Sequence, residues 1–168
     1  EETFAPQALG EIVRDVVELY EPVAEEQGLT LDAHVNETPI VEANRQLVGQ
    51  AVANLVDNAI KYGGDGAGAE EAAGAEHRRR IDIVVDATAT DGLVVIADHG
   101  PGIAAADRER VLRRFVRLDE SRTRPGTGLG LSLVAAVARL HGGVLKLDDN
   151  APGLRATLVL PKRRPGSG

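Results

Sequence analysis

The sequence predicts a single α/β domain in which helices and strands alternate along the chain. Residues 6–27 and 44–62 have the apolar periodicity of core-facing helices, and residues 129–140 indicate a third helix. Short runs with strand patterns lie between and after them. Because 43% of the 168 residues are hydrophobic, residues 1–168 are long enough for one sizeable core, and we expect no second domain.

Composition and charge argue against several kinds of partner. A net charge of −7 disfavours nucleic acid and direct contact with an anionic membrane, and no apolar run approaches bilayer-spanning length. The absence of cysteine fits a reducing compartment, so we expect a cytoplasmic domain. We also expect the isolated domain to be a monomer. The chain also lacks methionine, even at residue 1, so we interpret it as a piece of a longer protein. A membrane anchor elsewhere in that longer protein is compatible with this interpretation.

The first predicted helix covers residues 6–27, with Gly28 as its stop and a kink expected at Pro22. Its expected apolar side consists of Leu9, Ile12, Val13, Val16, Val17, Leu19, Tyr20 and Val23. An alternating strand at residues 29–35 and a short extended piece at residues 40–41 lead into the next helix.

The central helix, residues 44–62, begins with Asn44 as a plausible N-cap. Its apolar side chains form two four-apart rows, which are Leu47, Ala51, Leu55, Ala59 and Val48, Val52, Val56, Ile60. A separate polar side carries Asn54, Asp57, Asn58 and Lys61 within about one hundred degrees of the circumference. A solvated surface is one interpretation, but asparagine is a poor mid-helix residue, whereas its amide oxygen suits magnesium and a nearby lysine suits phosphate.

The second half begins with residues 63–80, which contain five glycines and five alanines and which we interpret as a flexible insertion. Residues 81–89 and 92–98 are expected to be adjacent antiparallel strands that deliver Asp98 to a strand end. After the third helix, stopped by Gly142 and Gly143, a closing hairpin is expected at residues 143–149 and 154–160, followed by a frayed tail at residues 161–168.

Two glycine motifs flank a charged stretch. Gly126, Gly128 and Gly130 precede or open the third helix, where unpaired N–H groups favour an anion. No strand directly precedes them and no Walker lysine follows, so the two commonest nucleotide folds are disfavoured. Asp98 precedes the sequence GPGI, residues 100–103, and its carboxylate is suited to the exocyclic amine of adenine, although a simple Asp-initiated turn fits the same pattern.

The motifs NLVDNAIKYG, DHGPGI and RRFVRLDESRTRPGTGLGLSLV resemble, in that order, the N, G1, F and G2 boxes of the histidine-kinase catalytic domain. This domain belongs to the superfamily of gyrase, Hsp90, histidine kinases and MutL. The resemblance implies a two-layer α/β sandwich, the Bergerat fold, with a mixed sheet of about five strands backed by three helices. It also implies ATP and Mg²⁺ as cofactors.

Residue by residue, the resemblance implies Asn58 as the magnesium ligand, with Asn54 as a second candidate beside the metal and phosphates. Lys61 and Arg117 would contact phosphates, so that Asn54, Lys61 and Arg117 are the expected catalytic residues. Asp98 would bind the adenine amine. The other expected nucleotide contacts are Tyr62, Gly100, Gly102, Ile103, Phe115, Gly126, Thr127, Gly128, Leu129 and Gly130, and residues 104–126 would form the ATP lid.

Two residues separate the candidate functions. Hydrolytic relatives carry a glutamate base where this chain has Asn54, and an amide cannot accept a proton from water, which favours a kinase. The best match to a phosphoacceptor box, at His34, lies in a strand-like stretch, so the acceptor is expected on a separate dimerisation domain, with a response regulator downstream. An anti-sigma-factor-type serine kinase and a binding module without transfer are the alternatives. His99 replaces the family's usual asparagine, and we interpret it as a tolerated loop residue without a catalytic role.

Overall fold

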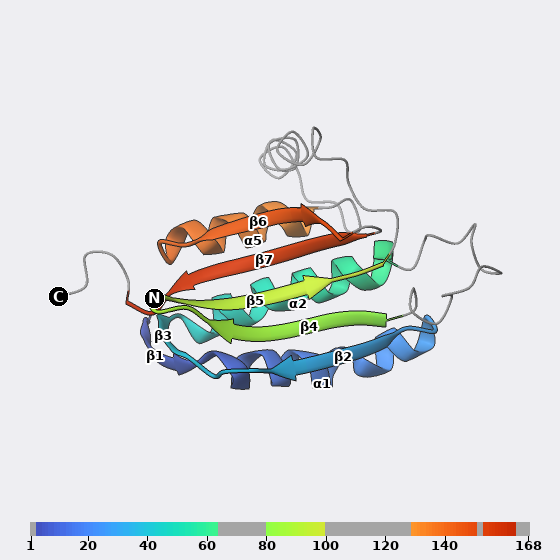
Figure 1. The fold of residues 1–168 in the computed structure, drawn as a ribbon, viewed down its shortest axis with the longest axis horizontal. Coiled ribbons are helices and arrows are strands. Elements are labelled where there is room, and N and C mark those ends of the chain that lie inside the picture. The colour runs from blue at the N-terminus through green and yellow to red at the C-terminus, as the bar shows by residue number, and fades with distance from the viewer. Residues whose placement is uncertain (1–2, 64–79, 100–128, 151–152, 164–168) are drawn as a thin grey trace.

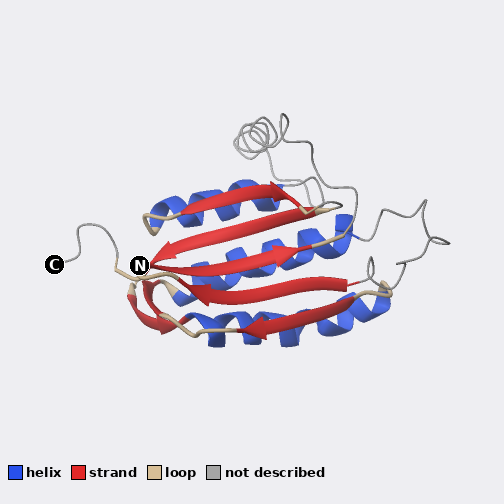
Figure 2. Ribbon diagram, in the orientation of Figure 1, coloured by secondary structure: helices blue, strands red, loops and turns tan. Residues whose placement is uncertain are grey.

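The computed structural model describes residues 3–63, 80–99, 129–150 and 153–163, which form a sheet with helices on one face (Figure 1). The main sheet consists of β2 (Thr30–Val35), β4 (Arg80–Ala87), β5 (Asp91–Ala97), β7 (Leu154–Pro161) and β6 (Val144–Asp149), in that spatial order. Its helices are α1 (Leu9–Glu26), α2 (Arg45–Gly63) and α5 (Leu129–Leu140) (Figure 2). Since β2 is parallel to β4 and the other neighbours are antiparallel, the expected two-layer sandwich with a mixed five-stranded sheet is confirmed.

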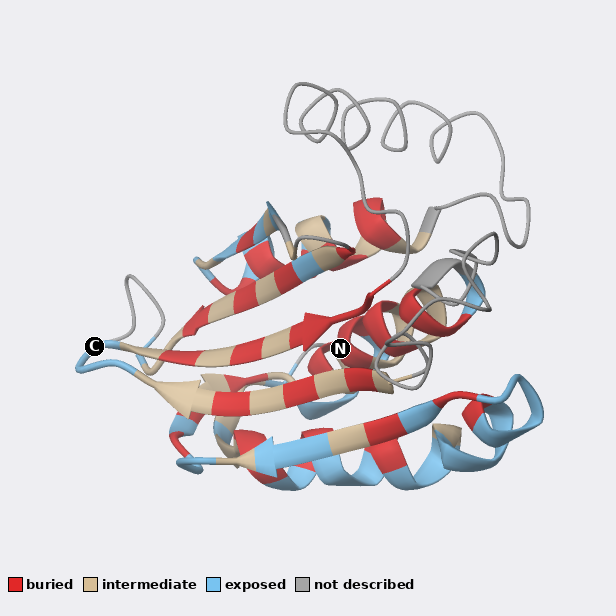
Figure 3. Cartoon of the chain, turned by 45° about the vertical axis from the view of Figure 1, so that its right-hand side comes forward, coloured by how far each residue is buried: buried red, intermediate tan, exposed pale blue. Residues whose placement is uncertain are grey.

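The core lies between the helix layer and the sheet. Helix α2 packs between α1 and α5, and Val48, Val52 and Val56 are fully buried, as the two apolar rows predict. Buried and part-exposed residues alternate along the central strands (Figure 3). Ile81 and Ile83 of β4 are among the buried residues that form the core. Each such side chain stabilises the fold by about 1.5–3 kcal/mol on leaving water. Within the described ranges, no helix combines the length and the apolar character that crossing a bilayer requires.

The start of α2 is attached to the end of α5. Asn44 is the N-cap, as expected, because its Oδ1 accepts a hydrogen bond from Leu47 N–H at 3.0 Å. The Asn44 N–H donates to Nε2 of His141 at 3.2 Å, so the proton of the neutral ring lies on Nδ1, which donates to the Val137 carbonyl at 2.8 Å. His141 is therefore a buried structural residue that joins two helices.

The start of the first helix differs from the prediction. Residues 6–8, expected to be helical, lie instead in β1 (Ala5–Ala8), which pairs antiparallel with β3 (Ile40–Ala43), and α1 begins only at Leu9. The pairing partner is more than thirty positions away, so helical periodicity cannot detect it. The helix then continues through Pro22 to Glu26, and Gly28 follows with a positive φ of 76°.

Two residues expected on the apolar side of the first helix are exposed. Leu19 is 69% exposed and Val23 is 40% exposed. Helix α1 lies at the edge of the helix layer, where it packs on α2 and β2, and none of the described helices lies on its outer side. The buried stripe is consequently narrower than the apolar pattern indicates.

Smaller corrections concern strand ends. Residues 88–89, expected in a strand, form the turn between β4 and β5, whereas Asp91 belongs to β5. Pro161 and Lys162, expected in the frayed tail, are instead attached to the fold, because Pro161 belongs to β7 and the Lys162 backbone donates to Thr90 O and accepts from Glu42 N–H at 2.9 Å each. These bonds attach the end of β7 to segments distant in sequence. The expectation for residues 164–168 lies outside the described residues. The helix stop expected at Gly142 is confirmed by its φ of 80°.

Candidate functional site

The described candidate residues lie toward one end of the sandwich. The carboxyl ends of α2 and β5, the amino end of α5 and the β6–β7 turn all point to this end (Figure 1). Helix α2 contributes Asn54, Asn58 and Lys61, β5 leads into Asp98, and α5 contributes Gly130. Residues expected to share one ligand therefore come from three elements that meet at one edge of the fold.

The polar side of α2 is partly buried. Asn54, Asp57 and Asn58 are half-buried, and Lys61 is exposed. The Lys61 Nζ lies 3.2 Å from Asp57 Oδ2, one helical turn away. This ion pair holds the lysine along the helix, and its expected phosphate contact remains a prediction.

Tyr20 of α1 lies beside this ion pair. Burial raises the pKa of the Tyr20 phenol above 10.0, the nearby Asp57 carboxylate raises it further, and Lys61 opposes both effects. The phenol is therefore protonated at neutral pH.

The first turn of α5 lies against Asn54. A Cβ atom placed on Gly130 would be 3.5 Å from the Asn54 Cβ and 3.7 Å from its Cγ, which are van der Waals contact distances, so the first turn of α5 lies directly against the Asn54 side chain. Unpaired N–H groups and the positive dipole end make the first turn of a helix favourable for an anion. The Asn54 amide consequently borders a place suited to phosphate.

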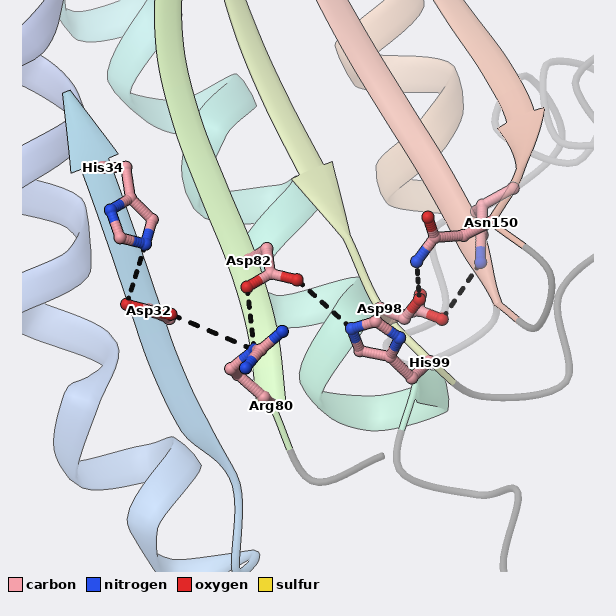
Figure 4. Close-up of polar contacts among 8 residues, drawn as sticks. Asp32, His34, Arg80, Asp82, Asp98, His99 and Asn150 are labelled. Atoms are coloured by element: carbon pink, nitrogen blue, oxygen red, sulfur yellow. Dashed lines mark hydrogen bonds and ion pairs between the residues drawn. The ribbon is translucent and has the colours of Figure 1, made fainter. Parts of the chain in front are cut away.

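Asp98 is held by the β6–β7 hairpin. Its side chain is buried, and Oδ1 accepts a hydrogen bond from Leu154 N–H at 3.1 Å. The Asp98 N–H donates to Leu154 O at 3.0 Å, and Asn150 Nδ2 donates to the Asp98 carbonyl at 2.7 Å (Figure 4). The carboxylate is thus oriented before any ligand arrives.

The hairpin turn requires glycine next to this aspartate. Gly153 has a φ of 110°, and a Cβ atom there would lie 2.0 Å from the Asp98 carbonyl oxygen. Sequence reasoning missed the roles of Asn150 and Gly153, although the turn-forming letters NAPG mark residues 150–153. The pattern predicts a turn but does not show which strand end the turn contacts.

His99 follows Asp98 and is buried, with its Nε2 at 3.2 Å from Oδ2 of Asp82. The interpretation of His99 as a tolerated loop residue is therefore incomplete, because the ring has a specific partner on β4. His34 lies on β2, mostly exposed, beside Asp32. A phosphoacceptor histidine is expected to be exposed on a helix. His34 lies on a strand and the ring of His141 is buried, so neither fits that role.

The other expected site residues lie outside the described residues. These are Gly100, Gly102, Ile103, Phe115, Arg117, Gly126, Thr127 and Gly128, together with the lid at residues 104–126 and most of the insertion at residues 63–80. Tyr62 and Leu129 are placed as helical backbone only. In the part of the chain that is described, no three His, Asp or Glu side chains are arranged to hold a metal ion.

The family described as "Histidine kinase-, DNA gyrase B-, and HSP90-like ATPase" matches residues 43–164, well over half of the chain. This chain belongs to that family. The Mycolicibacterium smegmatis signal transduction histidine-protein kinase/phosphatase MprB is 36% identical over 132 residues, which cover 74% of this chain and 24% of MprB. The adaptive-response sensory kinase SasA of Synechocystis is 33% identical over 145 residues, which cover 86% of this chain and 35% of SasA.

A solved structure agrees in fold and in extent. The catalytic domain of histidine kinase ThkA superposes with a TM-score of 0.77 at 25% identity, over 96% of this chain and 97% of that domain. The chain thus spans about a quarter to a third of the two curated relatives and nearly the whole of a solved catalytic domain.

Proposed function

We propose that this chain is the ATP-binding catalytic domain of a two-component sensor histidine kinase. It binds Mg²⁺ and ATP and transfers the γ-phosphate to a histidine on a separate dimerisation domain. The observation that carries the proposal is the meeting of the Asn54 amide with the first turn of α5, at the end of the fold where Asp98 is held rigidly. Together these groups suit a metal-bound triphosphate and an adenine.

The donor set fits magnesium. Asn58, with Asn54 beside it, would offer amide oxygens, which are the hard ligands that Mg²⁺ accepts together with phosphate oxygens and water. When bound, the ion supplies positive charge that neutralises the phosphates. Lys61 and Arg117 add cationic side chains for the same charge, and Asp98 selects the base by accepting the adenine amine.

The transfer step follows from these roles. An unprotonated imidazole nitrogen of the acceptor attacks the γ-phosphorus, the bond to the β–γ bridging oxygen breaks, and ADP leaves. Because Asn54 cannot take a proton from water, hydrolysis lacks a base at that position. The domain therefore holds ATP until an acceptor histidine arrives.

The partners follow from the same step. We infer a histidine-containing dimerisation domain of the same kinase and a downstream response regulator. Since ATP is abundant in the cytoplasm, the domain would work there, as part of a longer protein. Alone, it would bind ATP without phosphorylating itself.

Transfer to a panel of histidine-containing helical hairpins tests the proposal. The domain is incubated with γ-labelled ATP and each hairpin, and a hairpin with its acceptor histidine replaced by glutamine is the control. We expect an acid-labile phosphate on the native hairpin only. An acid-stable product would indicate a serine kinase, ATP binding without transfer to any hairpin would indicate a binding module, and rapid hydrolysis by the domain alone would indicate an ATPase.

A further inference from the structure

Polar side chains form a row of contacts across the face of the sheet that the described helices leave uncovered (Figure 4). Leu31, Ile81 and Ile83 are buried against the helices, so their alternating neighbours point to the opposite face. The contacts run from His34 to Asp32 at 3.2 Å, Asp32 to Arg80 at 3.9 Å, Arg80 to Asp82 at 2.9 Å and Asp82 to His99 at 3.2 Å. This row of contacts ends at His99, next to Asp98, the candidate adenine ligand.

The charges in this row of contacts are unusual for a sheet surface. Asp32 and Asp82 are direct register partners on β2 and β4, and like charges placed opposite each other destabilise a sheet. Arg80 lies near both carboxylates and offsets their repulsion. Its buried Nε is 2.9 Å from Asp82 Oδ1 but forms no hydrogen bond, so the N–H does not point at that oxygen and the contact is an ion pair.

The second oxygen of Asp82 holds His99. An ionised carboxylate only accepts hydrogen bonds, so the proton in this contact lies on the His99 Nε2. The His99 side chain is 7% exposed and the Asp82 side chain is 24% exposed, so water competes little for the bond. Asp98 is thereby held from two sides, by Leu154 and Asn150 of the hairpin and through His99 by β4.

We propose that Asp82 is a positioning residue for base recognition. It holds the His99 ring and thereby keeps the neighbouring Asp98 carboxylate aligned with the exocyclic amine of adenine, while Arg80 keeps Asp82 in place. The inference rests on the proposed adenine contact of Asp98. It assigns recognition of the base to a residue on β4 that touches no nucleotide atom.

Two nucleotides separate positioning from general stability. ADP carries the 6-amino group, whereas purine riboside 5′-diphosphate has a hydrogen in its place. Calorimetry with both ligands compares the unmodified domain with Asp82→Ala, Asp82→Asn and Asp86→Ala. Asp86 is the matched control, because it lies on the same strand and the same face but at the far end from His99.

We expect Asp82→Ala to bind ADP about tenfold more weakly, the scale of one well-aligned hydrogen bond, and the amine-free analogue unchanged. Asp82→Asn keeps an acceptor for His99 and should stay within about twofold of the unmodified affinity for ADP. Asp86→Ala should bind both ligands normally. His99→Phe removes the Nε2–H in another way and should weaken the binding of ADP but not of the amine-free analogue. The double variant with Asp82→Ala should bind ADP no more weakly than His99→Phe does.

The possible outcomes distinguish failure of the Asp82 inference from failure of the proposed adenine contact of Asp98. If the unmodified domain binds ADP no better than the analogue, Asp98 does not read the amine, and the proposed adenine contact falls together with the inference. If the unmodified domain discriminates and Asp82→Ala discriminates equally well, the adenine contact stands and the inference is overturned. Equal loss of both ligands in Asp82→Ala also overturns it, since the role would then be general stability.

Discussion

The polar side of α2 and the end of β5 both belong to the proposed nucleotide site, but they are built differently. Asn54 and Asn58 stand on one helix, and the helical period alone places them on the same side. Asp98 instead receives hydrogen bonds from Asn150 and Leu154, which are 52 and 56 positions further along the chain.

This difference separates chemistry from folding. A polar side chain that its own helix places outside the core, such as Asn58, is replaceable without loss of the fold. A side chain held by distant segments also connects those segments, so a change around it affects both binding and stability. Four substitutions test this comparison.

The largest effect is expected on α2. Asn58→Ala should lower phosphoryl transfer by on the order of a hundredfold, because magnesium would lose the amide oxygen as a ligand. The free energy of unfolding should change by at most about 1 kcal/mol, because Asn58 is half-buried on the polar side of α2 and is not part of the core. Transfer to the hairpin and urea unfolding measure the two quantities, with the exposed Gln50→Ala on the same helix as the control. Unchanged transfer would contradict the assignment of Asn58.

The second effect concerns the other region. Gly153→Ala should lower the free energy of unfolding by about 2–4 kcal/mol, because the new Cβ atom would collide with the Asp98 carbonyl at a positive φ. It should also weaken ADP binding, since the collision displaces Asp98.

Gly28→Ala is the matched control for that variant. Gly28 has a positive φ of 76° but no atom within 4 Å of the added Cβ position. Its cost should be only about 1 kcal/mol, with ADP affinity unchanged. Equal costs at the two glycines would show that the hairpin does not press on Asp98.

A smaller effect is expected at Asp98 itself. Asp98→Asn keeps an oxygen that can accept the hydrogen bond from Leu154 N–H but presents an NH₂ group to the adenine amine. ADP affinity should fall by about 1.5–3 kcal/mol, the scale of a hydrogen bond to a charged group. Calorimetry with ADP measures it, and equal affinity for both proteins would remove Asp98 from the site.

The smallest effect is expected where α1 meets α2. Because the pKa of Tyr20 is raised in the folded state, the unfolded chain loses this proton first as pH rises, and unfolding becomes more favourable above about pH 10. Tyr20→Phe should remove the part of the stability loss above about pH 10 that is due to Tyr20. At lower pH the phenol is protonated in both states, so this contribution is absent there. Urea unfolding of both proteins from pH 8 to 11 measures the difference, and parallel curves would contradict the shift.

The sequence predicted more of the fold than of the site's surroundings. The α2 helix, its Asn44 cap and its two apolar rows were all correct, because they depend on neighbours within a few positions. The β1 strand was missed, because its partner β3 lies far along the chain. Leu19 was expected on the buried side of the first helix but is exposed, since periodicity cannot show how many neighbours a helix packs against.

The sequence by itself determined which side chains are candidates for the proposed nucleotide contacts, since Asn54, Asn58 and Asp98 are placed by the helical period and by the end of a strand. Only the tertiary structure decided what holds them. Gly130 comes against Asn54, Gly153 against the Asp98 carbonyl, and Asp82 against His99. The physical reason is that each of these contacts joins segments brought together by the packing of the sheet and its helices, and no local pattern records which distant surfaces will meet.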